Sequence, residues 1–301
     1  MNKKKILLWA PFGSGKHYWG PGISAYNLYQ QLDKSIYELH LAHGYKSQKD
    51  YTLFDSHTYI AKCGNSLFRQ LVFLIYAKYW LKINACKYDI MHSLSPMSIG
   101  FYPAIWFEKY GPGKAYVKVT AKNSGFSGNS RLSKWFKLDK NRIKNISNIS
   151  GIIAISTEIV TELQNLGISK KSINFIPNGV NTKVYSPVNK KSKTQLRKIL
   201  NIQDYFTVIF TGGISDRKSP STVLKAVTKL IEIKKEINLL IIGPERDNGD
   251  ELKIINSILN KDPNLLNRVH IIGHINNIEQ YYKIADIFVL PSTNEGMSNS
   301  Y

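Results

Sequence analysis

The chain has 301 residues, of which 43% are hydrophobic and 12% are aromatic. This length fits two α/β domains better than one small core, and the apolar content excludes an intrinsically disordered protein. The two cysteines, Cys63 and Cys86, are too few for a disulfide framework or a four-cysteine zinc site. We therefore expect a globular protein of a reducing compartment.

The formal net charge of +20 is confined to the first part of the chain. Residues 1–205 contain 30 Lys+Arg against 10 Asp+Glu, whereas residues 206–301 contain 11 of each. A basic surface of this size attracts nucleic acid, anionic lipid or an anionic substrate, and composition alone does not choose among them. Because no nucleic-acid-binding motif is recognised, a nucleic-acid partner is not expected.

The N-terminal segment begins with three lysines and continues into an apolar run at residues 6–10. This run is too short for a signal peptide, and Pro11 and Gly13 end it, so we expect a first strand at residues 5–10. No run of the sequence is long enough to be a membrane span. We therefore expect a cytoplasmic protein.

Strand-like and helix-like segments then alternate, which predicts parallel sheets built from βαβ units. A lysine-rich polar stretch at 187–193 resembles a linker. We expect an N-terminal domain at 1–186, a linker at 187–205 and a C-terminal domain at 206–301. Strands are expected at 5–10, 39–43, 89–93, 115–120, 152–156, 173–176, 206–211, 239–242, 269–272 and 287–290, and helices at 23–32, 67–83, 157–166, 220–234, 251–260 and 278–284.

The helix predicted at residues 67–83 has aromatic residues near one end and cations between its apolar positions. That composition is typical of a helix lying in a membrane interface. The alternative is a core helix packed on a sheet, which is the commoner class of amphipathic helix. We favour the core helix and keep the membrane interpretation open.

Five short motifs occur along the chain. They are Tyr88-Asp89-Ile90-Met91-His92-Ser93, Ile153-Ala154-Ile155-Ser156, Ile176-Pro177-Asn178-Gly179-Val180-Asn181, the segment 210–220, and the segment 281–292 with Glu295-Gly296. Each motif by itself is a weak signal. Their order and spacing together resemble those of the family 4 retaining glycosyltransferases (glycosyltransferase group 1), which have the GT-B fold.

The resemblance implies an α/β protein with two Rossmann-like domains facing across a cleft. It implies transfer of a hexose from a UDP- or GDP-linked sugar to a lipid-linked or polysaccharide acceptor, with retention of configuration, as in bacterial surface polysaccharide synthesis. The resemblance also implies transfer without a protein nucleophile, with an oxygen of the donor phosphate taking the acceptor proton. Together with the basic N-terminal half, this suggests a peripheral protein that contacts the anionic inner face of the cell membrane.

The leaving diphosphate requires stabilisation of negative charge in the transition state. Lys218 follows a predicted strand and precedes the helix that Pro220 opens, so its ammonium and the helix N-terminus can both face the phosphates. Arg217 assists or faces solvent, and an exposed basic turn is the alternative for both residues. The resemblance implies that Glu295 contacts the hydroxyls of the donor sugar, and we treat Lys218 and Glu295 as the catalytic candidates.

The remaining donor-side candidates are small or polar residues in the same two loops. Gly213 stands where many family members have a phosphate-binding arginine, which places more of the phosphate binding on Lys218 and Arg217. The other candidates are Gly212, Gly296, Met297, Ser298 and Asn299.

In the N-terminal domain, Gly20 and Gly22 lie between the first strand and the first helix and offer backbone N–H groups to an anion. A plain strand-to-helix turn is the alternative. The resemblance places His92 and Asn123 near the acceptor. A lone histidine is more often structural, and the segment around Asn123 departs from the family's usual motif.

The sequence has no Asp-x-Asp pair and no His/Cys cluster with metal-ligand spacing, so we expect neither a metal ion nor a cofactor. Lys218 would take the role of the cation. The family's second glutamate would lie beyond Tyr301, which suggests a C-terminally truncated chain with an incomplete second domain. The alternative function is therefore an inactive fragment that binds a membrane or a partner.

Overall fold

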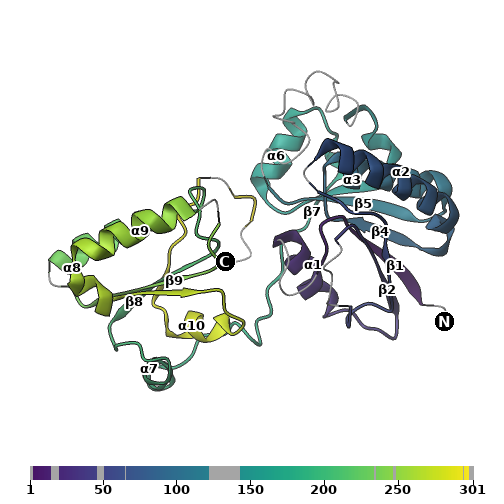
Figure 1. The fold of residues 1–301 in the computed structure, drawn as a ribbon. Coiled ribbons are helices and arrows are strands. Elements are labelled where there is room, and N and C mark those ends of the chain that lie inside the picture. The colour runs from purple at the N-terminus through teal and green to yellow at the C-terminus, as the bar shows by residue number, and fades with distance from the viewer. Residues whose placement is uncertain are drawn as a thin grey trace. The chain divides into compact units, whose positions relative to one another are not determined.

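The computed structural model describes residues 3–14, 20–45, 51–64, 66–121, 143–233, 235–246, 249–293 and 295–297. The chain forms two compact units. Unit 1 comprises residues 1–179, together with 296–299 and 301, and unit 2 comprises residues 180–295 together with 300. Each unit contains one parallel sheet covered by helices on both faces (Figure 1).

Unit 1 contains, among its described residues, a seven-stranded parallel sheet with the order β3-β2-β1-β4-β5-β6-β7. The chain leaves β1 toward one edge and returns beside it at β4. Such a reversal of strand order is the place where open α/β sheets bind ligands. The strands are β1 (Lys4–Ala10), β2 (Tyr37–His43), β3 (Ser56–Tyr59), β4 (Ile90–Ser93), β5 (Lys114–Val119), β6 (Gly151–Ala154) and β7 (Ile173–Phe175).

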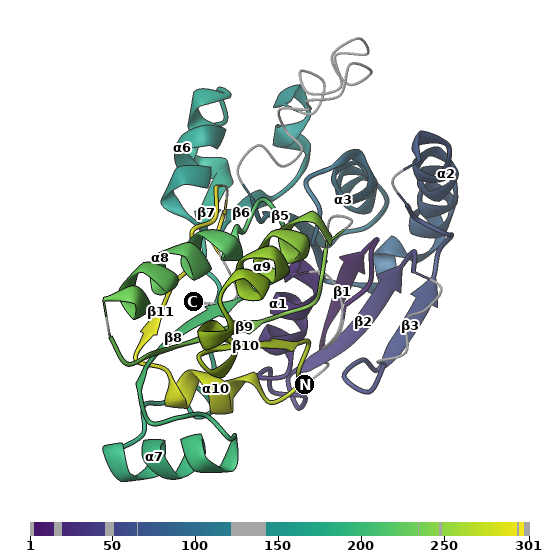
Figure 2. The ribbon, with the colours of Figure 1, turned by 60° about the vertical axis from the view of Figure 1, so that its left-hand side comes forward.

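Helices cover both faces of this sheet, which explains the uninterrupted apolar runs of its central strands. Leu7 and Trp9 of β1 enter the larger core, beneath α2, α3 and α6, while Leu8 enters the smaller core, beneath α1. Helices α2 and α3 lie side by side (Figure 2). The helices are α1 (Gly20–Tyr29), α2 (Leu67–Asn84), α3 (Ser98–Tyr110) and α6 (Thr157–Asn165), with 3-10 turns η1 (Ala85–Lys87), η2 (Ile146–Asn148) and η3 (Lys170–Ser172).

Unit 2 has a parallel sheet with the order β10-β9-β8-β11. Helices α8 and α9 cover one face, and α7 and α10 cover the other (Figure 1). The elements are α7 (Lys190–Ile199), β8 (Phe206–Thr211), α8 (Pro220–Glu232), β9 (Ile237–Ile242), α9 (Asp250–Lys261), η5 (Pro263–Asn267), β10 (Val269–Gly273), α10 (Ile278–Ile284) and β11 (Ile287–Phe288).

The expected strands and helices are present, with shifted ends, and two further elements of unit 1 were not predicted. Strand β3 has the sequence Ser-His-Thr-Tyr and lies at the sheet edge, so it has no apolar run to reveal it. Helix α3 contains Pro103, which interrupts the pattern expected of a helix. Helix α1 begins at Gly20, so Gly20 and Gly22 belong to its first turn and do not form a separate loop.

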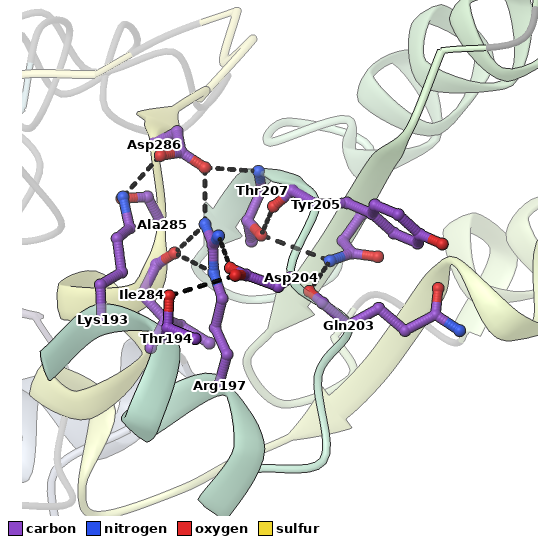
Figure 3. A network of polar contacts seen from close by, with 11 residues as sticks. Lys193, Thr194, Arg197, Gln203, Asp204, Tyr205, Thr207, Ile284, Ala285 and Asp286 are labelled. Atoms are coloured by element: carbon purple, nitrogen blue, oxygen red, sulfur yellow. Dashed lines mark hydrogen bonds and ion pairs between the residues drawn. The ribbon is translucent and has the colours of Figure 1, made fainter. Parts of the chain in front are cut away.

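Residues 187–205, where composition suggested a linker, contain helix α7. Its Arg197 is buried and donates hydrogen bonds to Asp204 (2.7 Å), to the carbonyl of Ile284 (2.8 Å) and to Asp286 (2.7 Å) (Figure 3). A charged side chain therefore provides part of the contact between α7 and the rest of unit 2. Because this segment is polar, its composition did not predict a helix that packs on unit 2.

Asp286 connects this helix to the sheet. Its carboxylate also accepts hydrogen bonds from Lys193 Nζ (2.5 Å) and from the backbone N–H of Thr207 (2.7 Å), as Figure 3 shows. Because Thr207 belongs to β8 and Asp286 directly precedes β11, one carboxylate ties α7 to the amino ends of two adjacent strands.

Among the described residues, no helix is long and apolar enough to cross a bilayer.

The substitution Asp286→Asn removes the charge that faces buried Arg197 while preserving the size of the side chain. We expect the free energy of unfolding of unit 2 to fall by roughly 2–3 kcal/mol, because Arg197 keeps only Asp204 as a charged partner. Urea unfolding followed by circular dichroism measures the change. The matched control is Asp250→Asn, which breaks the exposed Asp250–Lys253 pair and should leave the free energy of unfolding nearly unchanged, because exposed ion pairs contribute little. Equal effects of the two substitutions would contradict the assignment.

Candidate functional site

Three charged side chains meet in unit 2 beyond the carboxyl ends of β8 and β11. Oε1 of Glu295 lies 2.6 Å from Nη1 of Arg217 and 3.0 Å from Nζ of Lys218. Lys218 is on the loop after β8, and Glu295 is on the loop after β11. These two strands are parallel neighbours, so their carboxyl ends lie side by side. The structure therefore brings together the two residues that the sequence identified as catalytic candidates.

A backbone hydrogen bond also joins the two loops, because the N–H of Thr293 donates to the carbonyl of Arg217 (3.0 Å). Within the loop after β11, the hydroxyl of Ser292 donates to Oε1 of Glu295 (2.7 Å). Burial raises the pKa of Glu295, but hydrogen bonds from Ser292 and Lys218, with the charges of Lys218 and Arg217, outweigh it and lower the pKa below its usual value. Glu295 is therefore a carboxylate at neutral pH.

Gly212 determines how Lys218 lies in this cluster. Its φ of +148° favours glycine, and a Cβ built there would lie 2.8 Å from Cδ of Lys218. A Cβ on Gly243, at the end of the neighbouring strand, would lie 1.8 Å from the carbonyl oxygen of Gly212. The absence of side chains at these positions lets the stem of Lys218 lie directly across the strand end, with its ammonium at Glu295.

Arg246, which the sequence did not single out, lies over Gly213. A Cβ on Gly213 would be 2.8 Å from Cγ of Arg246, and the backbone N–H of Arg246 donates to the carbonyl of Ile214 (2.9 Å). Arg246 comes from the loop after β9, the strand next to β8. Arg246 thus lies beside the position at which the resemblance implies an arginine in many family members. In the sequence, the position of Arg246 shortly after a predicted strand was the feature that could have indicated a role in the site.

The N-terminus of α8 offers fewer backbone N–H groups to an anion than the sequence suggested. The backbone N–H of Ser221 donates to Oε1 of Glu251, a buried carboxylate of α9, at 2.8 Å. The N–H of Thr222 donates to the carbonyl of Ser219 (3.1 Å). Two of the N–H groups at the start of this helix are therefore satisfied within unit 2. The positive character of the site depends mainly on side chains.

His92 is buried in unit 1, in the middle of the sheet on the face that α1 covers. Its Nδ1 lies 2.7 Å from the hydroxyl of Tyr29 on α1. Burial, and then the charge of Lys118, lower the pKa of His92 to about 3, so the imidazole is neutral at physiological pH. Its Nε2 has no hydrogen-bond partner among the described residues. This placement favours the structural alternative for His92 over an acceptor contact.

Lys118 is a second titratable group on this face, and the sequence analysis missed it. Its Nζ donates to Oδ1 of Asn178 (2.9 Å) and to Oγ of Ser24 (3.3 Å), and Ser24 itself donates to Asn178 (2.9 Å). Lys118 therefore joins β5, α1 and the Pro-Asn-Gly motif after β7. Burial lowers its pKa to about 8. A lysine inside a short apolar strand was the signal that could have revealed it.

The other candidates have no comparable geometry. Gly20 and Gly22 are in the first turn of α1, where the carbonyl of Gly22 accepts a hydrogen bond from Ser14 Oγ (2.9 Å). Gly296 and Met297 follow Glu295 and are grouped with unit 1. The rest, Asn123, Ser298 and Asn299, lie outside the described residues.

Two family models match the chain, one in each unit. Residues 20–184 match the model described as "Glycosyltransferase Family 4", and residues 192–300 match "Glycosyl transferases group 1". The first match alone spans more than half of the chain. The chain belongs to glycosyltransferase family 4. The family resemblance inferred from the five motifs is thereby confirmed.

Curated relatives of this glycosyltransferase match it over about half its length. The UDP-Gal:alpha-D-GlcNAc-diphosphoundecaprenol alpha-1,3-galactosyltransferase of Escherichia coli is 28% identical over 138 residues, which are 45% of this chain and 34% of the relative. The alpha-galactosylglucosyldiacylglycerol synthase of Streptococcus pneumoniae is 24% identical over 147 residues, which are 48% of this chain and 38% of the relative. The matched segments thus cover just over a third of these relatives.

Solved structures match over nearly the whole chain. HepE of Anabaena, solved in complex with UDP, superposes with a TM-score of 0.73 at 15% identity, covering 96% of this chain and 74% of that one. A sucrose-phosphate synthase of Thermosynechococcus elongatus has a TM-score of 0.71 at 16% identity, covering 99% and 78%. These matches confirm the expected fold class, the GT-B type with two Rossmann-like domains.

The buried amine of Lys118 predicts how stability depends on pH. Its pKa is about 8 in the folded protein and 10.5 for an unperturbed lysine, so between these values the folded state binds fewer protons than the unfolded state. Its contribution to the free energy of unfolding therefore rises with pH across this window, by at most roughly 3 kcal/mol. Urea unfolding of the wild type and of Lys118→Met from pH 7.5 to 10.5 measures the difference. Parallel pH profiles of the two proteins would refute a lowered pKa.

Proposed function

We propose that this glycosyltransferase moves a hexose from a UDP- or GDP-linked sugar to a lipid-linked or polysaccharide acceptor, with retention of configuration. The observation that carries the proposal is the meeting of Lys218, Arg217 and Glu295 at the ends of two adjacent strands. The cluster combines two cations with one carboxylate. A nucleotide sugar presents the complementary pair of groups, an anionic diphosphate and a ring of hydroxyls.

Each side chain has a separate part in this proposal. Lys218 and Arg217 bind the diphosphate and stabilise the negative charge that grows on it as the bond to the sugar breaks. Glu295, ionised at neutral pH, accepts hydrogen bonds from the sugar hydroxyls. The contact between the cations and the carboxylate keeps both kinds of group close to one another, so that phosphate and sugar are bound in a fixed relation.

The chemical step balances without a protein nucleophile. The bond between the anomeric carbon and the diphosphate oxygen breaks, and its electron pair leaves with the nucleoside diphosphate. The acceptor oxygen forms the new bond to the same face of that carbon, and its proton passes to a phosphate oxygen. Because Lys218 and Arg217 supply positive charge, no metal ion or other cofactor is included in the proposal.

The named relatives support the acceptor class. The Escherichia coli relative is named for an acceptor linked to diphosphoundecaprenol, and the Streptococcus pneumoniae relative is named for the synthesis of a diacylglycerol glycolipid. Both acceptors carry lipid chains. We therefore propose that the enzyme works as a peripheral protein at the cytoplasmic face of the cell membrane, on a lipid-linked acceptor.

The activity is tested with the full chain, a panel of UDP- and GDP-sugars, and undecaprenyl-diphosphate-linked or diacylglycerol-linked acceptors. We expect a glycoside with the anomeric configuration of the donor, identified by NMR. Lys218→Ala and Glu295→Gln should each lower kcat/KM by about 100-fold or more, because each removes a group that contacts the donor.

The control is Lys229→Ala, on the exposed side of α8, which should keep wild-type activity. Unchanged activity of both site variants would refute the assignment of the site, and an inverted product would refute retention. If the protein forms no product with any donor and UDP and GDP do not raise its melting temperature, the alternative of an inactive binding fragment replaces the proposal.

Arg246 extends the proposed phosphate site, because it lies over Gly213 beside the strand end that bears Lys218. We expect Arg246→Ala to weaken the binding of UDP or GDP about tenfold, the effect of losing one charge-assisted hydrogen bond. Isothermal titration calorimetry measures the Kd. Lys225→Ala, on the exposed side of α8, serves as the control for the loss of one positive charge. Equal Kd values for Arg246→Ala and the wild type would exclude Arg246 from the site.

A further inference from the structure

Helix α2 of unit 1 has two apolar faces, of which only one is buried. Phe73, Ala77 and Leu81 are fully buried in the core beneath it. This face confirms the core-helix interpretation. Seven further apolar residues of the helix are exposed to between 50% (Leu67) and 73% (Phe68) of their surface, whereas Val72, Leu74 and Trp80 are partly buried.

The exposed apolar residues form a continuous surface, which we call the α2 apolar face. At about 100° per residue, they fall on one side of the helix, opposite the three core residues. In Figure 2, α2 lies at the outer margin of unit 1, with α3 on its inner side. The α2 apolar face consists of Leu67, Phe68, Leu71, Ile75, Tyr76, Tyr79 and Ile83.

Cations lie within and beside this face, and helix α2 contains no acidic residue. On the same helical projection, Lys78 and Lys82 lie among Leu67, Leu71 and Ile75 on one half of the face, and Arg69 lies at the edge of the other half. The ammonium of Lys78 is 5.9 Å from the ring centre of Trp106 on α3, which holds it beside the apolar residues. The helix thus presents aromatic and aliphatic side chains between long cationic ones.

We infer that the α2 apolar face is the surface by which unit 1 binds an anionic lipid bilayer. The helix lies in the plane of the membrane interface, with Phe68, Ile75 and Tyr79 among the acyl chains and the cations at the lipid phosphates. This inference specifies the surface for the membrane association proposed above. It is independent of the donor site, which lies in unit 2.

Charge complementarity favours a bilayer over a protein partner. Lysine is depleted from protein–protein interfaces, yet two lysines lie within this face. A second copy of the chain is also disfavoured, because a two-fold interface would bring together two copies of the same cationic surface. The net charge of +20, all of it in residues 1–205, adds to this repulsion and to the attraction toward anionic lipid.

The inference is tested by sedimenting the full chain, without any nucleotide sugar, with vesicles of phosphatidylcholine alone or mixed with phosphatidylglycerol. We expect binding to the anionic vesicles. The double variant Ile75→Ser/Tyr79→Ser should lower the partition coefficient at least tenfold. The charge reversals Lys78→Glu/Lys82→Glu should abolish the preference for phosphatidylglycerol. The altered side chains are exposed, so circular dichroism and the melting temperature should match those of the wild type.

The matched controls are Ile199→Ser and Lys198→Glu, which change an exposed isoleucine and an exposed lysine on α7 of unit 2. Both should bind vesicles as the wild type does. Glu295→Gln should also bind normally, so that failure of the enzyme assay and failure of membrane binding are distinguished. Equal binding by the wild type and Ile75→Ser/Tyr79→Ser would overturn the inference. So would a dimer, detected by gel filtration, that this variant converts to a monomer.

Discussion

The parallel pairing of β8 with β11 is the constraint on which the candidate site depends. At the carboxyl ends of these strands, Glu295 lies 3.0 Å from Lys218. At their amino ends, Asp286 accepts a hydrogen bond from the backbone of Thr207 and pairs with Arg197. The strand pair is therefore held at both ends by carboxylates from the β11 side.

The site also depends on close approach of the backbone. Gly212 follows β8 and Gly243 follows the neighbouring strand β9. Their backbones approach each other so closely that a side chain on Gly243 would collide with the carbonyl of Gly212. The space above them is filled by the stem of Lys218 and, over Gly213, by Arg246. Positive charge at this edge thus comes from two loops, after β8 and after β9.

Unit 1 shows how differently buried and exposed cations behave. Lys118 is desolvated, is held by the neutral oxygens of Asn178 and Ser24, and loses part of its affinity for protons. Lys78 and Lys82 on α2 are exposed beside apolar residues. The first kind of lysine links elements of the fold, whereas the second leaves its charge on the surface. The high net charge of the sequence did not distinguish these roles.

The resemblance to the family implied that Lys218 and Glu295 share one site, and the sequence by itself determined the alternation of strands and helices and the two α/β halves. These features are local patterns: apolar runs and periodicity follow from which residues face a core, and loops after parallel strands always meet at one edge. Only the tertiary structure decided that His92 is a buried partner of Tyr29, that Arg197 makes α7 part of unit 2, and that Arg246 lies over Gly213. It likewise decided that α2 is apolar on both its buried and its exposed sides. Each of these depends on contacts between residues distant in the chain, and no pattern along a single segment records what will pack against it.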